Sequence, residues 1–292
     1  MSASDARPVR VQAEPVTGPV AHHAEGPVWS AAWGGLRFVD LEAGALLTLR
    51  DGRVDRLELG EPIAAFVRPR RTGGYVVALE RGVALATAPD VLPTLRVDIW
   101  AEESVRMNDG TVDPDGRLLA GGMAYDARPA GSAVYRIDAD LRPEVVVPAV
   151  TVSNGIDFSP DGSLCYYVDS LEHRIDVFDY RCGEMDNRRP FVEVAPESGL
   201  PDGLTVSADG SVWVAIWGGA AVHGYSPEGD LHTVVELPVT QVSACAFGGD
   251  DLDVLYITTS RQGLADGVEV DAGGVFSARV GHRGLPVRPF AG

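Results

Sequence analysis

One short pattern returns along the whole chain, and it constrains the fold more than any other feature. In its clearest copy a run of β-prone residues, Gly155–Ser159, is followed by a Pro-Asp-Gly turn and a second run, Leu164–Asp169. Asp-Gly between two such runs predicts a β-hairpin, because glycine accepts the positive φ angle that tight turns need. A polar residue, Asn154, stands seven positions before the turn aspartate. The repeat therefore combines a hairpin with one fixed polar position.

The same arrangement occurs along the rest of the chain. Asn108 and Asp202 stand seven positions before the turn aspartates Asp115 and Asp209. The six copies begin near residues 25, 64, 108, 154, 202 and 243, at intervals of 39, 44, 46, 48 and 41 residues. Irregular repeats of about 40–50 residues made only of strands are typical of β-propellers with four strands per blade. We therefore expect an all-β fold, a six-bladed β-propeller with four-stranded blades.

The repeats also predict the extent of the domain. They leave no linker, so residues 1–292 are expected to form a single propeller domain, with residues 1–8 as a flexible tail. Val9–Val16 is expected to pair with the last blade, which would close the ring and remove an open sheet edge.

Composition restricts the possible partners and location. Lys and Arg number 24 against 42 Asp and Glu, a formal charge of −18, which argues against binding to nucleic acid or to an anionic membrane. No apolar run approaches the roughly 18 residues of a membrane-spanning helix, and Met1–Val11 lacks the apolar segment of a signal peptide. The three scattered cysteines are expected to be buried free thiols. We expect a cytoplasmic protein that is a monomer or a weak homo-oligomer.

The equivalent positions at the starts of the repeats predict a binding site. They are Glu25, Ala64, Asn108, Asn154, Asp202 and Ser243. The first strand of each blade lines the central channel of a propeller, so these positions are expected to form a ring around one mouth. Carboxylate, amide and hydroxyl oxygens with a net charge of −2 suit a divalent cation such as Ca²⁺, Mg²⁺ or Mn²⁺. The sequence therefore predicts a metal site in the central channel.

An ordinary structural interpretation exists for each member of this ring. Asn or Asp beside glycine is common in turns, but so many polar groups at one crowded mouth are costly to bury without a ligand. Residues of the second strands are expected to rim the same mouth: Asp40, Met123, Asp169, Ser170, Trp217 and Thr258. His22 and His23 are interpreted as rim or solvent residues, because no second histidine cluster accompanies them. A serine triad is unsupported, since no Gly-x-Ser-x-Gly elbow occurs.

Several segments of the chain resemble the regucalcin (senescence marker protein)/gluconolactonase/luciferin-regenerating-enzyme-like family. They are Glu25–Trp29, Arg106–Gly110, Ser153–Gly155, Tyr167–Ser170, Pro201–Gly203, Phe247–Gly249 and Gly273–Phe276. The resemblance covers nearly the whole chain. It implies a six-bladed propeller that hydrolyses sugar lactones with one divalent metal ion, Ca²⁺, Zn²⁺, Mn²⁺, Mg²⁺ or Fe²⁺, in its central channel.

The resemblance also implies roles for individual residues. By that likeness the metal ligands are Glu25, Asn154 and Asp202, and the substrate-binding residues are Arg106, Asn108 and Asp126. Asn108 would hold substrate or complete the metal shell, and Arg106 would bind sugar hydroxyls. The mammalian members carry a glutamate in the loop after the Met-Ala pair, where this chain has Tyr125–Asp126. Asp126 is expected to do the same work with a shorter reach.

These features predict a metal-dependent sugar lactonase acting on a gluconolactone-, xylonolactone- or arabinonolactone-like substrate to give the aldonic acid. A lactone is an ester, and its hydrolysis builds negative charge on the carbonyl oxygen, which a cation stabilises. Asp202 is the candidate to accept a proton from the attacking water. Two alternatives remain: a metal-dependent esterase or organophosphate hydrolase on the same scaffold, and a non-catalytic calcium-binding regulatory propeller.

Overall fold

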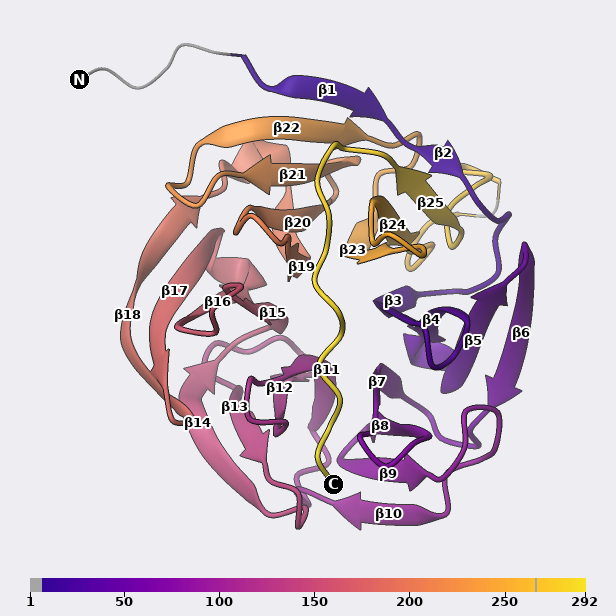
Figure 1. Ribbon diagram of the computed structural model, residues 1–292, viewed down its shortest axis with the longest axis vertical. Coiled ribbons are helices and arrows are strands. Elements are labelled where there is room, and N and C mark those ends of the chain that lie inside the picture. The colour runs from indigo at the N-terminus through magenta and orange to yellow at the C-terminus, as the bar shows by residue number, and fades with distance from the viewer. Residues whose placement is uncertain (1–6, 266) are drawn as a thin grey trace.

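Six β-sheets surround a central axis in the computed structural model, which describes residues 7–265 and 267–292 (Figure 1). Each sheet has four antiparallel strands, and one sheet gains a fifth. The predicted six-bladed β-propeller with four-stranded blades is confirmed. Most of the predicted flexible tail, residues 1–6, lies outside the described residues.

The innermost strands begin at, or up to three residues before, the six positions that the repeats predicted. They are β3 (Ala24–Ser30), β7 (Ala64–Pro69), β11 (Val105–Val112), β15 (Ser153–Phe158), β19 (Leu200–Val206) and β23 (Val242–Gly248). Neighbouring blades pack against both faces of these strands, so nearly all of their residues are buried. This burial explains why polar side chains on them stand out as candidates for function.

Two further sets of strands continue each blade outward. The second strands are β4 (Gly35–Asp40), β8 (Tyr75–Leu79), β12 (Leu118–Ala124), β16 (Leu164–Asp169), β20 (Val212–Trp217) and β24 (Val254–Thr259). The third strands are β5 (Ala45–Arg50), β9 (Gly82–Ala86), β13 (Ser132–Ile137), β17 (Arg174–Arg181), β21 (Ala221–Tyr225) and β25 (Val275–Ala278). Short 3₁₀ turns connect second and third strands in two blades, η1 (Leu41–Ala43) and η2 (Ser170–Glu172), and a third, η3 (Pro196–Ser198), precedes β19.

The outermost strands contain most of the exposed residues that lie in strands, although β22 (Leu231–Glu236) has none. They are β6 (Arg53–Glu58), β10 (Leu95–Asp98), β14 (Pro143–Val150), β18 (Glu184–Glu193) and β22 (Leu231–Glu236), with β2 (Glu14–Pro15) as the outer strand of the last blade. The apolar core therefore lies between the blades, where their inner and middle strands meet.

The N-terminal strands close the ring in two places. β1 (Val9–Gln12) pairs in parallel with β22 and adds the fifth strand to blade five, whereas β2 pairs antiparallel with β25 in blade six. The prediction that Val9–Val16 pairs with the last blade is therefore correct for β2 and wrong for β1. One short segment joins two neighbouring blades.

The hairpin turns of the repeat have the predicted chemistry. Gly162 has a φ angle of 73°, in the left-handed region that glycine adopts readily. Beside it, Asp161 Oδ1 accepts hydrogen bonds from Ser163 N at 3.0 Å and from Ser159 Oγ at 2.6 Å. The turn aspartate is thus a structural residue.

The three cysteines differ in burial. Cys165 and Cys245 are buried free thiols as expected, whereas Cys182 is exposed. Among the helices of the described residues, none is long and apolar enough to cross a membrane.

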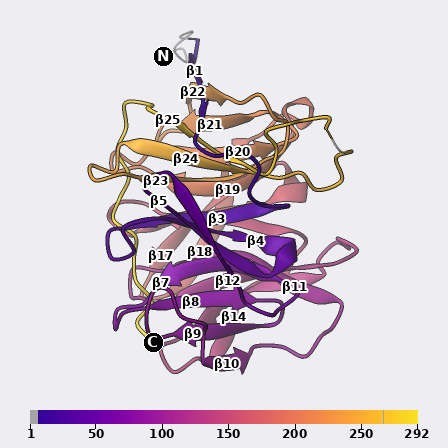
Figure 2. The same ribbon diagram turned by 90° about the vertical axis from the view of Figure 1, so that its right-hand side faces the viewer.

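The C-terminal segment crosses one face of the propeller. From β25 it runs over the centre of the ring and ends beside blades two and three (Figure 1). Arg70 forms a β-bridge with Phe290, and Ser207 forms one with Gly284. Figure 2 shows this segment along one face of the disc, while the described parts of the connection between β24 and β25, residues 260–265 and 267–274, extend from the opposite face.

Candidate metal and substrate site

A buried polar pocket lies where the inner strands begin, at the mouth opposite the C-terminal segment. It has a volume of about 190 Å³, below the roughly 300–1,000 Å³ of sites for drug-sized ligands. Five of the predicted site residues line it: Glu25, Arg106, Asn108, Asn154 and Asp202. Their exposed fractions are only 5–9%. The structure thus brings together side chains from four blades in a space that suits a small ligand.

Irregular strand pairing aims these side chains into the pocket. The register of the inner strands shifts at Glu25, between Met107 and Asp109, between Ser153 and Ile156, and between Pro201 and Leu204. In a regular strand successive side chains point to opposite faces of the sheet, and a bulge changes the direction of one of them. Bulges are common beside active sites. The polar residues at the equivalent repeat positions, Glu25, Asn108, Asn154 and Asp202, lie in or beside these bulges.

Glycine follows Asn154 and Asp202 because neighbouring strands approach closely there. A Cβ atom on Gly155 would lie 2.5 Å from Leu204 N and 2.6 Å from Asp202 O. Gly203 stands equally close to Ala244 on β23. The Asn-Gly and Asp-Gly pairs of the inner strands therefore reflect packing around the channel, besides any turn preference.

A chain of hydrogen bonds orients the amide groups. Arg106 Nη1 donates to Asn108 Oδ1 at 2.7 Å, and Asn108 Nδ2 donates to Asn154 Oδ1 at 3.1 Å. Asn154 Nδ2 in turn donates to Ser170 Oγ at 2.8 Å. An amide oxygen has two acceptor sites, so Asn154 Oδ1 keeps one for a cation.

Buried negative charge gathers at the same place. The pKa of Asp202 is raised well above its usual range by burial, by Glu25 and by Asp109. Burial, followed by the charge of Glu25, also raises the pKa of Asp109 to about 7. Glu25 Oε2 accepts a hydrogen bond from Gly26 N at 2.9 Å, so its other oxygen, Oε1, is the one that could bind a cation. A divalent cation would offset the repulsion between these carboxylates.

The donors suit a cation bound by mixed carboxylate and amide oxygens. Two buried acids and the amide oxygen of Asn154 are hard ligands of the kind that divalent cations accept. In the described part of the chain, no group of three or more His, Cys, Asp or Glu side chains is placed to hold a metal ion. The metal-ligand roles of Glu25, Asn154 and Asp202 therefore remain predictions.

Two of the predicted positions do not reach the pocket. The Asp126 carboxylate forms an ion pair with Arg128 at 3.1 Å and is 65% exposed. Its neighbour Tyr125 donates a hydrogen bond from Oη to Glu80 Oε1 at 2.6 Å. Ser243, the sixth ring position, is fully buried and donates to Ala24 O at 2.6 Å. Asp126 and Ser243 thus satisfy their polar groups away from the other site residues.

The residues expected at the rim fall into two groups. Met123, Ser170 and Trp217 line the pocket as predicted. Asp40 and Asp169 do not, because their carboxylates accept backbone N–H groups from the segments that enter the inner strands. Asp40 Oδ1 accepts from His22 N at 3.1 Å and from His23 N at 3.0 Å, and Asp169 accepts from Thr151 N at 2.8 Å and Val152 N at 2.9 Å.

Asp40 and Asp169 therefore hold the entry segments in place. Thr258, the remaining rim candidate, is fully buried and lies 2.9 Å from Ser243 Oγ.

His23 is a pocket residue to which the sequence interpretation gave no part in binding. It is buried and lines the pocket, whereas the side chain of His22 is 52% exposed, as expected. Of the two interpretations given for His23, the rim position agrees with the structure and the solvent position does not. A signal was present, because residues two positions apart on an extended chain point to the same side, and His23 stands two positions before Glu25.

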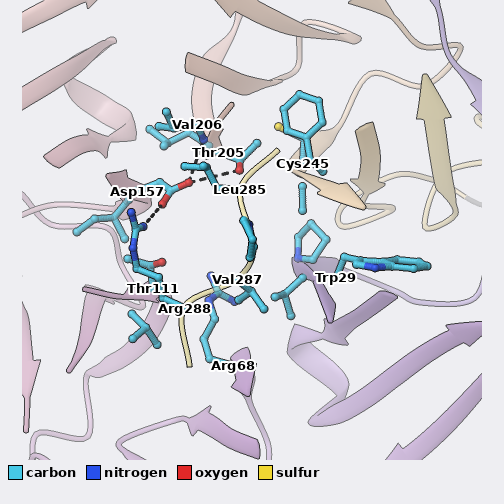
Figure 3. A pocket seen from close by; sticks show the side chains of 18 residues that line it. Trp29, Arg68, Thr111, Asp157, Thr205, Val206, Cys245, Leu285, Val287 and Arg288 are labelled. Atoms are coloured by element: carbon cyan, nitrogen blue, oxygen red, sulfur yellow. Dashed lines mark hydrogen bonds and ion pairs between the residues drawn. The ribbon is translucent and has the colours of Figure 1, made fainter. Parts of the chain in front are cut away.

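The other end of the channel has a different character. There the C-terminal segment contributes Leu285, Val287 and Arg288 to a second pocket (Figure 3). Asp157 accepts a hydrogen bond from Val206 N at 2.9 Å and forms an ion pair with Arg288 at 3.6 Å. Its charge is thus already paired with the segment that covers this end. The mouth around Glu25 is the better candidate for a metal ion.

The fold and this pocket together define a six-bladed propeller with a buried polar site at one end of its channel. The chain belongs to the SMP-30/Gluconolactonase/LRE-like family, whose model matches residues 23–261. The resemblance of its motifs to that family is thereby confirmed.

Relatives of known name match almost the whole chain. Regucalcin from Sus scrofa is 36% identical over 286 residues, 93% of this chain and 95% of its own length. Regucalcin from Homo sapiens is 33% identical, over 92% and 94% of the two chains.

Solved structures show the same architecture. A luciferin-regenerating enzyme is 28% identical with a TM-score of 0.86, covering 96% of this chain and 99% of its own. A calcium-binding regucalcin from Agrobacterium tumefaciens is 22% identical with a TM-score of 0.88, covering 97% and 99%. At that lower identity the likeness concerns the fold alone.

Proposed function

We propose that this protein is a metal-dependent lactonase that hydrolyses a sugar lactone of the gluconolactone, xylonolactone or arabinonolactone kind to the aldonic acid. The observation that carries the proposal is the convergence of Glu25, Asn154 and Asp202 with Arg106 and Asn108 in one small buried pocket. Carboxylates and amides suit a cation, and the guanidinium and amide groups suit sugar hydroxyls. A solved relative of the same fold, from Xanthomonas campestris, is described as a gluconolactonase.

Glu25, Asn154 and Asp202 would hold the divalent cation in this proposal. When bound, such an ion stabilises negative charge on the carbonyl oxygen of an ester as a Lewis acid. The protein's own side chains then have to position the lactone and manage the protons of the reaction.

Asp202 is the group proposed to move the proton. It takes a proton from the attacking water while the water oxygen bonds to the carbonyl carbon. It then returns the proton to the ring oxygen as the carbon–oxygen bond of the ring breaks. Burial and the charge of Glu25 raise the pKa of Asp202 in the absence of an ion, and a bound cation would offset both effects and keep the carboxylate ionised, as a base must be.

Arg106 and Asn108 are proposed to orient the substrate. The 2.7 Å hydrogen bond between them fixes both groups at the pocket wall, which limits the poses of a sugar ring. Asp126 can join them only if its ion pair with Arg128 is broken. We therefore assign substrate binding chiefly to Arg106 and Asn108.

A lactone panel on metal-stripped protein tests the proposal. Hydrolysis of gluconolactone, xylonolactone and arabinonolactone would be followed with a pH indicator after each divalent ion is restored, with a phosphotriester as a further substrate. We expect metal-dependent turnover of at least one lactone. Turnover of the phosphotriester alone would favour the organophosphate hydrolase. Calcium binding without any turnover would favour a regulatory propeller.

Substitution of Asp202 tests the proposed chemistry. Asp202→Ala is expected to fold and to lower kcat/KM by at least about 100-fold, the usual contribution of a general base. Asp115→Ala is the matched control, because Asp115 is an exposed turn aspartate of the same repeat. Full lactonase activity in Asp202→Ala would remove the mechanism.

A further inference from the structure

The imidazole of His23 is held firmly at the mouth of the channel. Its Nδ1 lies 3.0 Å from Ser260 Oγ, and its ring stacks at a tilt on Trp217 with centroids 5.5 Å apart. Its Nε2 lies 3.7 Å from Glu25 Oε1. A buried ring anchored on two sides presents its remaining nitrogen to the pocket in a defined direction.

The contact between His23 and Glu25 is too long for a hydrogen bond. N–H···O bonds in proteins span about 2.7–3.2 Å, and the separation here is 3.7 Å. No residue that the structure describes makes a hydrogen bond with His23 Nε2, and Glu25 Oε1 is likewise left over once Oε2 has bonded to Gly26 N. Two atoms capable of binding a cation therefore face the same space.

Ser260 can accept the ring proton of the His23 tautomer that would bind a cation through Nε2. It is fully buried, and its Oγ accepts a hydrogen bond from Gln262 N at 3.0 Å. A hydroxyl oxygen has two acceptor sites, so the second can accept the proton of His23 Nδ1. The lone pair then lies on Nε2, toward Glu25. Metal-binding histidines in proteins are usually oriented in this way through their other nitrogen.

We propose that His23 Nε2 is a ligand of the divalent cation at this mouth and that it makes the site select Zn²⁺, Co²⁺ or Fe²⁺ over Ca²⁺. The inference rests on the cation of the proposed function. Metal–nitrogen and metal–oxygen bonds are each about 2.0–2.2 Å long, so His23 Nε2 and Glu25 Oε1, 3.7 Å apart, would both be able to hold the same ion. Imidazole suits these transition metals, whereas Ca²⁺ prefers oxygen ligands.

The remaining ligands would come from other blades. Repulsion between the buried carboxylates of Glu25 and Asp202 favours their separation, and among the described residues these acids and His23 are not gathered into a ready site. A bound cation would offset that repulsion and let the ligands approach one another. Asn154, whose Oδ1 retains one acceptor site, would complete a set of one nitrogen and three oxygens. A neutral imidazole in place of a neutral oxygen ligand leaves the charge of the set unchanged. It makes the set softer, and ligand softness is the property that decides between Zn²⁺ and Ca²⁺.

Metal titration of stripped protein tests the proposal without reference to activity. Isothermal titration calorimetry with Zn²⁺ and with Ca²⁺ would compare wild type, His23→Ala and His22→Ala. We expect His23→Ala to weaken Zn²⁺ binding at least about tenfold and to change Ca²⁺ binding by less than about threefold. The visible absorption of bound Co²⁺ should also change. His22→Ala is the matched control, because His22 is exposed and pairs with Glu42.

The possible results separate the two proposals. Unchanged Zn²⁺ affinity in His23→Ala overturns the role of His23, and so does an equal loss for Zn²⁺ and Ca²⁺, which would mean that His23 only positions Glu25. If His23→Ala fails to fold, His23→Gln gives the same comparison with a side chain that still fills the space. Wild type that binds neither ion would overturn the metal site of the proposed function itself.

Discussion

At the residue scale, the buried carboxylates make stability depend on pH in an unusual direction. Burial and the charge of Glu25 raise the pKa of Asp109 to about 7, whereas an exposed aspartate in the unfolded chain titrates near 3.9. Between these values the folded protein binds more protons than the unfolded chain. The free energy of unfolding therefore falls as pH rises through this window.

We predict that the midpoint of thermal unfolding of metal-stripped protein falls between pH 5 and pH 7.5. Asp109→Asn should flatten this dependence, because the amide does not titrate. Calorimetric scans of both proteins across the window provide the measurement. The comparison of the two isolates Asp109 from the general repulsion of a chain with a charge of −18. Identical slopes in the two proteins would contradict the prediction.

The sequence predicted much of the site because its repeat fixes which residues are equivalent. Glu25, Asn154 and Asp202 occupy one repeat position, so their convergence followed from the propeller alone. Asp126 and His23 lie outside that position, in segments whose path depends on local contacts. The ion pair of Asp126 with Arg128 and the buried contact of His23 with Ser260 join residues that no short sequence pattern relates.

At the scale of the strand, the site depends on close packing of inner strands around the channel. Gly155 on β15 and Asp202 on β19 belong to neighbouring blades, yet a Cβ atom on Gly155 would come within 2.6 Å of the Asp202 carbonyl oxygen. Any side chain at position 155 must therefore displace the strand that carries Asp202. The glycine links packing directly to the geometry of the pocket.

Gly155→Ala is expected to destabilise the protein by about 1–3 kcal/mol, the usual cost of overpacking, and to weaken metal binding. Denaturant unfolding and metal titration would measure the two effects. Gly18→Ala is the matched control, because nothing lies within 4 Å of a Cβ atom placed there. Wild-type stability and metal affinity in Gly155→Ala would show that the strands can move apart freely.

Strand positions could be predicted more fully than strand partners. The hairpins follow from local turns such as Pro160–Gly162, and all six innermost strands begin within three residues of where the repeat predicted. The split of the N-terminal segment between blades five and six could not be read from the sequence. That pairing depends on which distant edge is free, and β1 and β2 are too short and polar to show a distinctive pattern.

At the scale of the whole molecule, the C-terminal segment packs against the face opposite the site and stabilises it. Phe290 is fully buried in the core of blades one to three, and its N–H donates to Pro69 O at 2.8 Å. Arg71 N donates to Phe290 O at 2.8 Å. The last residues of the chain thus contribute to the core at one end of the channel, far from the polar mouth.

Phe290→Ala is expected to lower the free energy of unfolding by about 3–5 kcal/mol, as for other buried phenylalanines. Because the substitution lies at the opposite face, metal affinity should stay within about twofold of wild type under conditions where the variant is folded. Denaturant unfolding and calorimetric titration measure these quantities. A variant with wild-type stability would mean that the packing of Phe290 does not stabilise this face.

Closure by the N-terminal strands has a consequence for synthesis on the ribosome. β1 emerges early, yet the residues it pairs with in β22 lie 224 positions later. At about 5–20 residues per second, the nascent edge waits on the order of 10 to 50 seconds for its partner. Arg10 and Gln12, which later bond with Glu236, make that waiting strand polar. A short polar strand is a poor template for pairing with other nascent chains. The composition of β1 therefore lets it stay unpaired without aggregating until β22 has been synthesised.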